Sequence, residues 1–174
     1  MKTIRKREIG IRIDKITESI VNTISGDSFQ TEITKVNKDI ALRIIPDVWL
    51  FDWQEEFKRK GVEVYMLSIS GNINIIQGLV SVTDRGDHLF LNLIESAEFN
   101  KGKRKLYLGV PGNLVAFCCK KSFDMGYEGY VAFTSKTKLI EHYQRSLGAT
   151  LVKGQQMMIT PPVAIKLIHQ YFKL

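Results

Sequence analysis

A glycine-bearing turn between two apolar segments is the part of this sequence whose residue types best suit ligand binding. Residues 107–117 pass from a strand-like segment into a helix-like one through Gly109, Pro111 and Gly112. The first N–H groups of a helix have no partner within the helix and carry a partial positive charge, so such a turn can bind an anion, for example a pyrophosphate. The same residues also suit an ordinary strand-to-helix turn, and the turn alone does not decide between the two.

A carboxylate that follows an apolar row is the second candidate for chemistry. Every second residue from Leu89 to Leu93 is apolar, and Glu95 is next in that row, so all of them would share one face of a strand. We expect burial on that face to raise the pKa of the Glu95 carboxyl, which would suit a general base. The alternative is that the strand is uncovered there and Glu95 is a solvated surface residue.

Metal and nucleophile chemistry find no support in the sequence. The histidines at His88, His142 and His169 do not have the spacing of metal ligands, and the adjacent Cys118 and Cys119 are a poor zinc pattern. No serine or cysteine nucleophile has a readable partner, and no phosphate-binding loop of the Gly-x-x-x-x-Gly-Lys type occurs. We predict no metal site.

Length and composition fit one soluble domain. The 174 residues are 44% hydrophobic, which is enough for a core without disulfides. No apolar run approaches the roughly 20 residues of a membrane span, the basic N-terminus lacks the apolar segment of a signal peptide, and the cysteines suit a reducing compartment. We expect a cytoplasmic protein without membrane contact. The net charge of +7 favours polyanionic partners, either a cofactor with several phosphates or nucleic acid.

Residues 1–27 are predicted to form a basic leader followed by a short amphipathic helix. Isoleucines recur there at helical spacing, at Ile13, Ile16, Ile20 and Ile24. We expect this helix to pack on a single domain that spans residues 28–174.

The first half of that domain changes from helical to extended periodicity. The predicted elements are a strand at 30–35, a helix from about Leu50 to Gly61, and strands at 62–70, 73–83 and 89–97. Gly71 and Asn72 are the predicted hairpin turn between the first two of these last three strands. Three antiparallel strands in succession are expected.

The second half alternates helices and strands. The predicted elements are a helix from about Asn113 to Met125, a strand at 130–134, a helix from about Thr137 to Leu147, an extended segment at 150–160 and a final helix after Pro161 and Pro162. The final helix carries Val163, Leu167, Ile168, Tyr171 and Phe172 on one face. An antiparallel meander that runs into alternating strands and helices is an α+β pattern.

This order of elements, with the glycine-bearing turn after the fourth strand, resembles the GNAT superfamily of acyl-CoA-dependent N-acetyltransferases over about residues 30–160. Members carry a pyrophosphate-binding turn of the form Arg/Gln-x-x-Gly-x-Gly/Ala. The best register places Leu108, Pro111 and Asn113 at its three marked positions, and all three depart from the motif. The proline removes one amide donor. The resemblance implies a mostly antiparallel, mixed central sheet flanked by helices, with the N-terminal and C-terminal helices as additions.

The resemblance also implies that acetyl-CoA is the co-substrate and that the backbone amides from Gly112 to Leu114 hold its pyrophosphate. The implied coenzyme-binding residues are Ser96, Ala97, Glu98, Gly109, Val110, Gly112, Asn113, Leu114 and Lys136. The basic run Lys103, Arg104 and Lys105 can replace the cation that the motif has lost.

A second part of the resemblance lies in residues 138–149, which look like the family's helix with a tyrosine ahead of a Gly-Phe pair. Tyr143 stands at the tyrosine position, where it would protonate the departing thiolate of CoA, with Glu95 as the candidate base. Ala149 replaces the phenylalanine, and Asn92 stands where related sequences often carry an acid. A core tyrosine is the alternative for Tyr143, and an amine that arrives uncharged is the alternative to a base.

We therefore hypothesise an N-acetyltransferase that transfers an acetyl group from acetyl-CoA to a primary amine. A module without catalysis that recognises nucleic acid or protein through its basic surface is one alternative. An enzyme whose amine is carried by a nucleic acid, such as aminoacyl-tRNA, is another. The sequence does not specify the acceptor. The sheet edge at residues 150–160 can pair with a second copy, so a homodimer is a further hypothesis.

Overall fold

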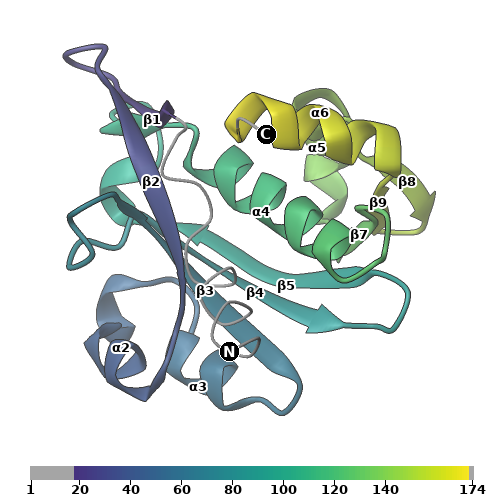
Figure 1. The fold of residues 1–174 in the computed structure, drawn as a ribbon, viewed down its shortest axis with the longest axis horizontal. Helices are drawn as coiled ribbons and strands as arrows, with labels where there is room; N and C mark the ends of the chain where they lie inside the picture. The colour runs from purple at the N-terminus through teal and green to yellow at the C-terminus, as the bar shows by residue number, and fades with distance from the viewer. Residues whose placement is uncertain (1–17, 173–174) are drawn as a thin grey trace, which may run out of the picture.

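The computed structural model describes residues 18–172, which form a nine-stranded sheet with helices on both faces (Figure 1). The strands are β1 (Glu18–Asn22), β2 (Ser28–Lys35), β3 (Val62–Ile69), β4 (Gly78–Asp84), β5 (Leu89–Ser96), β6 (Tyr107–Leu108), β7 (Val131–Thr134), β8 (Thr150–Lys153) and β9 (Gln156–Ile159). Their spatial order is β6-β1-β2-β3-β4-β5-β7-β9-β8. Every neighbouring pair is antiparallel except β5 and β7.

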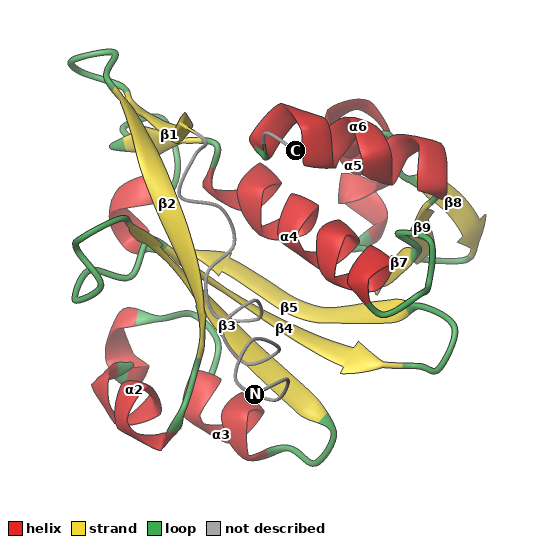
Figure 2. Cartoon of the chain, viewed as in Figure 1, coloured by secondary structure: helices red, strands yellow, loops and turns green. Residues whose placement is uncertain are grey.

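The helices of the described residues divide between the two faces of the sheet (Figure 2). They are α2 (Lys38–Arg43), α3 (Trp53–Lys58), α4 (Val110–Asp124), α5 (Ile140–Leu147) and α6 (Pro161–Tyr171), with short 3-10 turns at Pro46–Val48, Glu98–Asn100 and Thr137–Leu139. Helices α4, α5 and α6 lie on one side, and α2 and α3 lie on the other (Figure 1). This arrangement confirms the predicted α+β fold with a mostly antiparallel sheet.

The parallel strands β5 and β7 are paired only near their beginnings. Leu89 pairs with Val131 and Phe90 pairs with Ala132. Beyond these residues β5 stays paired with β4, and β7 stays paired with β9. The sheet therefore opens between its two parallel strands.

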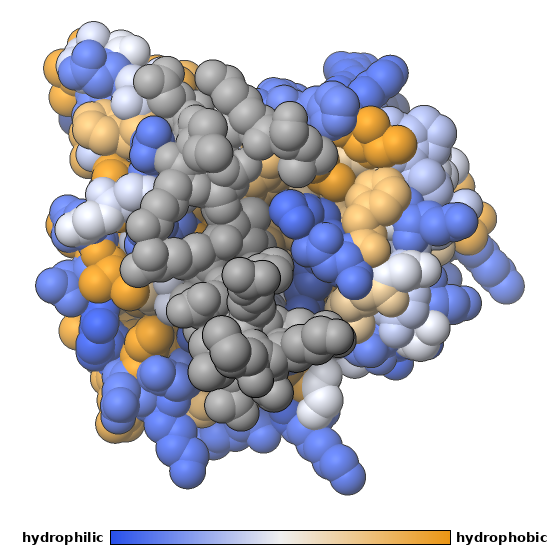
Figure 3. All heavy atoms as spheres, viewed as in Figure 1, coloured by the Kyte–Doolittle hydropathy of each residue, from blue (hydrophilic) through white to orange (hydrophobic). Residues whose placement is uncertain are grey.

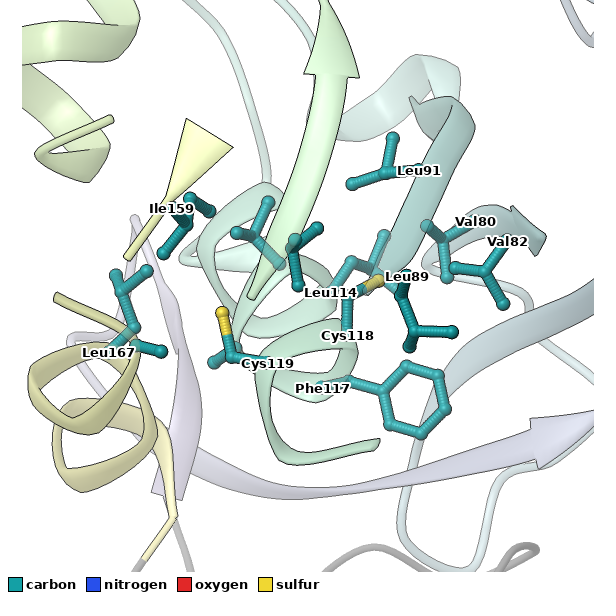
Figure 4. Close-up of a cluster of buried hydrophobic side chains, with 14 of the residues drawn as sticks. Val80, Val82, Leu89, Leu91, Leu114, Phe117, Cys118, Cys119, Ile159 and Leu167 are labelled. Atoms are coloured by element: carbon teal, nitrogen blue, oxygen red, sulfur yellow. The ribbon is translucent and has the colours of Figure 1, made fainter. Parts of the chain in front are cut away.

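An apolar core lies on each face of the sheet. The larger one packs α4 against β4 and β5, and Figure 4 shows side chains of these elements, among them Val80, Leu89, Leu114 and Phe117, facing one another. The smaller one joins α2 and α3 to the sheet through residues that include Ile44, Trp53, Met66 and Leu79. The site described below lies between the two cores, where the sheet is open.

The two cysteines are core residues of α4, as the sequence predicts. Both side chains are fully buried (Figure 4). Burial raises the pKa of both thiols, that of Cys119 to about 12. They therefore remain protonated at neutral pH and pack as small apolar side chains.

The predicted N-terminal helix is wrong where the structure describes that segment. Residues 18–22 form strand β1, which pairs with β2 on one edge and with β6 on the other. Ile20 is buried in the larger core, while Ile24 is exposed. Pairing on two edges and the burial of Ile20 outweigh the helical spacing, because tertiary contacts override local preference. Ile13 and Ile16 lie outside the described residues.

The region between β3 and β4 also differs from its prediction. Strand β4 begins at Gly78 instead of Ile73, and residues 73–77 form a loop in which Ile73 and Ile75 are exposed. A run of β-branched residues suits a strand, but no partner strand faces this one.

Two helices also differ from their predictions. Helix α2 is not among the predicted elements. The predicted helix at 113–125 begins earlier, at Val110, because Pro111 fits the first turn, where its missing N–H costs nothing.

The described surface is mixed in polarity. Hydrophilic residues cover much of the rim in Figure 3, and apolar residues gather in small patches, one of them over α6. Several large apolar side chains at the end of α2 and between α2 and α3 are exposed, namely Leu42, Ile45, Val48 and Leu50. In the described part of the chain, no helix has the length and apolar character that crossing a membrane requires.

Two glycines after α4 test how tightly α6 and α4 pack. Both Gly126 and Gly129 have a φ of 85°, but a Cβ at Gly126 would meet open space, whereas one at Gly129 would lie 2.5 Å from Phe123 and 2.8 Å from Ala164. We expect Gly126→Ala to cost about 1 kcal/mol for its backbone conformation. Gly129→Ala should cost about 2 kcal/mol more because it also overpacks the core. Urea unfolding of the two variants checks this, and equal costs would contradict the packing described here.

Candidate active site

A cavity of about 650 Å³ lies where β5 and β7 diverge, a volume within the usual range for ligand pockets. Residues 91–96 and 133–136 form two of its walls. The turn before α4, the inner sides of α5 and α6, and the segment before α3 complete it, through Gly109, Gly112, Tyr143, Leu147, Leu167, Tyr171, Leu50 and Phe51. The cavity thus brings together the turn, Glu95 and Tyr143, which are far apart in sequence.

The turn at the start of α4 keeps two backbone donors available. Gly109 is the N-cap in the left-handed region, with a φ of 93°, and no side chain caps the helix. The N–H of Asn113 donates to the Gly109 carbonyl over 2.9 Å, and Pro111 has no N–H. Within the described residues the N–H groups of Val110 and Gly112 have no protein acceptor. Of the predicted run from Gly112 to Leu114, Gly112 therefore keeps an amide that a ligand can use, and Val110 adds a second one outside that run.

Four of the nine predicted coenzyme-binding residues line the cavity, namely Ser96, Gly109, Gly112 and Lys136. The other five, which are Ala97, Glu98, Val110, Asn113 and Leu114, do not form its walls. The buried Asn113 side chain donates to the Thr31 hydroxyl over 3.1 Å and so fastens the start of α4 to β2. Its role in this structure is to place the helix.

The Cα of Gly112 is covered by the side chain of Tyr171 from α6. A Cβ at position 112 would lie 2.0 Å from the Tyr171 hydroxyl oxygen. Gly112 is therefore required by this contact as well as by any phosphate. Substitution by a larger residue must displace the Tyr171 phenol, so it cannot test ligand binding alone.

A bulge in β5 breaks the regular alternation that the sequence suggests. Ser81 of β4 pairs with Leu93, and the next residue, Val82, pairs with Leu91. The extra residue at Asn92 shifts everything after it to the opposite face. Leu89 and Leu91 consequently face α4, whereas Leu93 and Glu95 face α3.

Glu95 is a buried anchor with all of its acceptor positions in use. Its Oε1 accepts from the Leu50 N–H at 2.6 Å and from Lys101 Nζ at 2.9 Å. Its Oε2 accepts from the Phe51 N–H at 3.2 Å and from Trp53 Nε1 at 2.8 Å. The carboxylate thereby holds the segment before α3 against the end of β5.

The pKa of Glu95 moves opposite to expectation. Burial acts to raise the pKa, but the four hydrogen bonds outweigh it, and the pKa lies below its ordinary value. The predicted raised pKa is wrong, because sequence cannot show which donors meet a buried carboxylate. The solvated alternative is wrong as well, since only 3% of the side chain is exposed.

A chain of hydrogen bonds connects α3 to the β5 bulge. Buried Glu56 pairs with Arg59 at 2.9 Å and accepts from the Ser81 hydroxyl at 2.8 Å. The Ser81 oxygen in turn accepts from the Leu93 N–H at 3.2 Å, an amide next to the bulge. The cavity wall at Asn92 and Leu93 is thus fixed from the opposite face of the sheet.

Tyr143 lies on α5 with its ring edge-on to Phe133, the two centroids being 5.4 Å apart. Its hydroxyl has no hydrogen-bond partner among residues 18–172. The His142 ring lies beside it, at 5.3 Å between centroids, and both residues line the cavity. Tyr143 is therefore a wall residue whose proton is available to a ligand.

The cations around the cavity are not equivalent. Lys101 pairs with Glu95 and, at 3.4 Å, with Glu98. Burial acts to lower the pKa of Lys101, but these carboxylates outweigh it and raise the pKa, so Lys101 is committed to the protein. Lys136 lines the cavity, is exposed and forms no ion pair within the described residues.

Among the described residues, no group of three or more His, Cys, Asp or Glu side chains could hold a metal ion.

Sequence reasoning missed the contribution of α6 to the site. It placed Leu167 and Tyr171 on the packed face of the final helix, which is correct, but gave no sign that this face meets Gly112. Phe51 is a residue that the sequence offers for an acceptor pocket, and it does line the cavity, whereas the place of Leu50 in the wall was missed because it depends on the hydrogen bond to Glu95. Only the pattern of long-range contacts could have revealed either.

Comparison with known proteins supports the fold. No known family model matches the sequence, and no curated protein matches it. Among solved structures, one similar fold is that of the AtaT toxin, solved as a tyrosine-to-phenylalanine mutant bound to the C-terminus of the antitoxin AtaR and acetyl-CoA. Its sequence is 12% identical, the TM-score is 0.53, and the match covers 80% of this chain and 99% of that one. A GNAT family acetyltransferase from Staphylococcus aureus Mu50 is 11% identical, with a TM-score of 0.54, over 75% and 99%. The spermidine/spermine N-acetyltransferase SpeG from Vibrio cholerae, in complex with manganese ions, is 12% identical, with a TM-score of 0.55, over 79% and 96%.

At these identities the matches establish architecture. The chain has the fold of the GNAT acetyltransferases, as the resemblance in its sequence predicts.

Replacing Glu95 should show its anchoring role through pH. The pKa is lowered in the folded protein, so its stabilisation is present above the ordinary value of 4.5 and is lost as the pH falls through the folded-state pKa. Glu95→Gln should therefore lower the unfolding free energy by about 3 kcal/mol at pH 7, and the deficit should shrink as the pH is lowered below about 4. Urea unfolding between pH 7 and pH 3 measures both.

The control for this experiment is Glu55→Gln on α3. Glu55 is exposed and pairs only with Lys58, so the change should cost about 0.5 kcal/mol or less. A Glu95→Gln deficit that is equally small, or independent of pH, would contradict the anchoring role.

Proposed function

We propose that this protein is an acyl-CoA-dependent N-acyltransferase that transfers an acetyl group from acetyl-CoA to a primary amine. The observation that supports it most is the cavity between β5 and β7, whose walls include both Gly112 of the α4 turn and Tyr143. This arrangement lies on a fold shared with acetyltransferases, one of which has been solved with acetyl-CoA. That this protein also binds acetyl-CoA is part of the proposal.

The residues present suit a coenzyme with a diphosphate and amide groups. The N–H groups of Val110 and Gly112 stand at a helix start, where anions are favoured. Beyond Phe90 and Ala132 the facing edges of β5 and β7 share no paired residues, so they can exchange hydrogen bonds with the amides of a ligand lying between them. Lys136 at the rim is a cation for a further phosphate.

Acetyl-CoA, when bound, supplies an acyl thioester. In the proposed reaction the amine nitrogen forms a bond to the acyl carbon and the C–S bond breaks, which leaves a thiolate. Tyr143 donates its hydroxyl proton to that sulfur and recovers a proton from solvent. The proton lost by the amine is released to water, so charge and atoms balance.

The cavity offers no free carboxylate as a general base. Glu95 is the sole carboxylate among the described wall residues, and its four acceptor positions are filled by protein donors. We propose that Glu95 positions Leu50 and Phe51 at the acceptor end of the cavity. The amine then reacts as its uncharged form, and the rate rises with pH as more of the amine loses its proton.

The charges of the cavity walls bear on the acceptor. The charged wall residues are Glu95, Lys101 and Lys136, and the first two neutralise each other. Because Lys136 is assigned to a phosphate of the coenzyme, the described walls leave no free carboxylate that could bind a second ammonium group of the acceptor. An acceptor whose other groups are neutral or anionic fits better.

Removing the Tyr143 hydroxyl should slow the chemical step. Tyr143→Phe should reduce kcat about 100-fold, while acetyl-CoA affinity changes less than about twofold, because a general acid acts in the transition state. A thiol-release assay with the best amine from a screen measures kcat, and calorimetry measures affinity. Tyr130→Phe, outside the cavity, is the control. An unchanged kcat for Tyr143→Phe would show that another group protonates the thiolate.

The acceptor prediction can be tested with a charge series of small primary amines. At equal concentration, thiol release should be no faster with spermidine than with an amine that has no second positive charge, because no free carboxylate of the described walls is available to bind the second ammonium group. Spermidine as the fastest acceptor would refute the proposed preference.

A further inference from the structure

Helix α6 forms part of the cavity although it follows the last strand of the sheet. It packs along α4 and buries Leu167, Ile168 and Phe172 in the larger core. Gln170 and Tyr171, near its end, line the cavity together with Leu167. The helix thus has one anchored face and one residue pair directed at the coenzyme end of the site.

Tyr171 stands directly against the turn that begins α4. A Cβ at Gly112 would lie 2.0 Å from the Tyr171 oxygen and 2.5 Å from the ring carbon that bears it. A Cβ is bonded to the same Cα as the Gly112 nitrogen, so the phenol lies within a few ångströms of that N–H. One small ligand group can contact both.

The turn itself is short of donors. Pro111 has no N–H, and the N–H of Asn113 is used by the Gly109 carbonyl. Only the amides of Val110 and Gly112 remain among the first four positions of the helix. An anion bound there would lack a hydrogen bond that a residue other than proline at position 111 would supply.

The Tyr171 hydroxyl is suited to supply that bond. It has no hydrogen-bond partner among the described residues. Burial raises the pKa of the phenol, so it stays protonated at neutral pH and acts as a donor. A protonated phenol next to a helix start places a third donor beside the two amides.

We propose that Tyr171 is a coenzyme-binding residue whose hydroxyl donates to the diphosphate of acyl-CoA, in place of the amide that Pro111 removes. The proposal rests on the proposed acyl-CoA function and adds to it a ligand from the helix that follows the last strand. It also explains why position 112 is a glycine, because any side chain there would push the phenol away from the turn.

The opposite role for Tyr171 is a plug that occupies the diphosphate position. The two roles predict opposite effects when the hydroxyl is removed. A ligand makes Tyr171→Phe bind CoA more weakly, and a plug leaves binding unchanged or makes it tighter.

Calorimetry with CoA on the full chain distinguishes them. Tyr171→Phe should weaken CoA binding roughly tenfold, the usual effect of losing a hydrogen bond to a charged group. Pro111→Ala restores an amide at the turn, so the loss caused by Tyr171→Phe should be clearly smaller in a Pro111→Ala background. The control is Tyr127→Phe, whose hydroxyl donates to Asp84 away from the cavity and whose loss should leave CoA affinity unchanged. A thermal melt of each variant verifies that the fold is kept.

Each result has one meaning. Weaker binding by Tyr171→Phe, with partial compensation by Pro111→Ala, supports the proposal. Equal or tighter binding overturns it in favour of the plug, and an equal loss in both backgrounds overturns the replacement of the Pro111 amide. A wild-type protein that binds CoA while Tyr171→Phe binds it equally well refutes this inference alone, whereas a wild-type protein that does not bind CoA refutes the proposed function and this inference with it.

Discussion

Strands β5 and β7 run side by side for only two residue pairs before they separate, and the properties of the site follow from that separation. Each strand keeps its outer partner, β4 or β9, so the sheet stays intact while the two inner edges face a cavity. Backbone groups on those edges remain available because no strand fills the gap. The helices α4, α5 and α6 are then close enough to add side chains without closing the space.

The two faces of the sheet hold this opening in different ways. On the α4 side, Asn113 fastens the start of the helix to β2. The apolar core packs the rest of α4 against β4 and β5. On the α3 side, two buried carboxylates do the holding. Glu95 binds the segment before α3, and Glu56 reaches the β5 bulge through Ser81. Buried charges of this kind are costly unless fully paired, and both are paired.

The same carboxylate limits the chemistry that the cavity can perform. A base must have a lone pair free and a pKa near the working pH, and Glu95 has neither. The Tyr143 hydroxyl, by contrast, is unengaged within the described residues and faces the same space. For the acyl transfer that we propose, such a site would be better equipped to protonate the leaving thiolate than to deprotonate the attacking amine. An acceptor that arrives uncharged is consistent with this asymmetry.

The sequence by itself determined the order of the main elements and the position of the turn. The extended, apolar composition of β3 and β5, the prolines at the starts of α4 and α6, and the glycines after α4 and α5 are local signals, and the structure follows them. The tertiary structure decided strand pairing and the face on which a side chain lies, which local signals do not specify. Strand β1 replaced a predicted helix because two neighbouring strands pair with it, and one extra residue at Asn92 moved Glu95 to the other face of the sheet. The donors around Glu95 and the phenol over Gly112 come from residues distant in sequence, between 6 and 45 positions away for Glu95. Hydrogen-bond partners, and hence pKa values and roles, depend on such distant contacts, whereas periodicity and turns depend only on near neighbours.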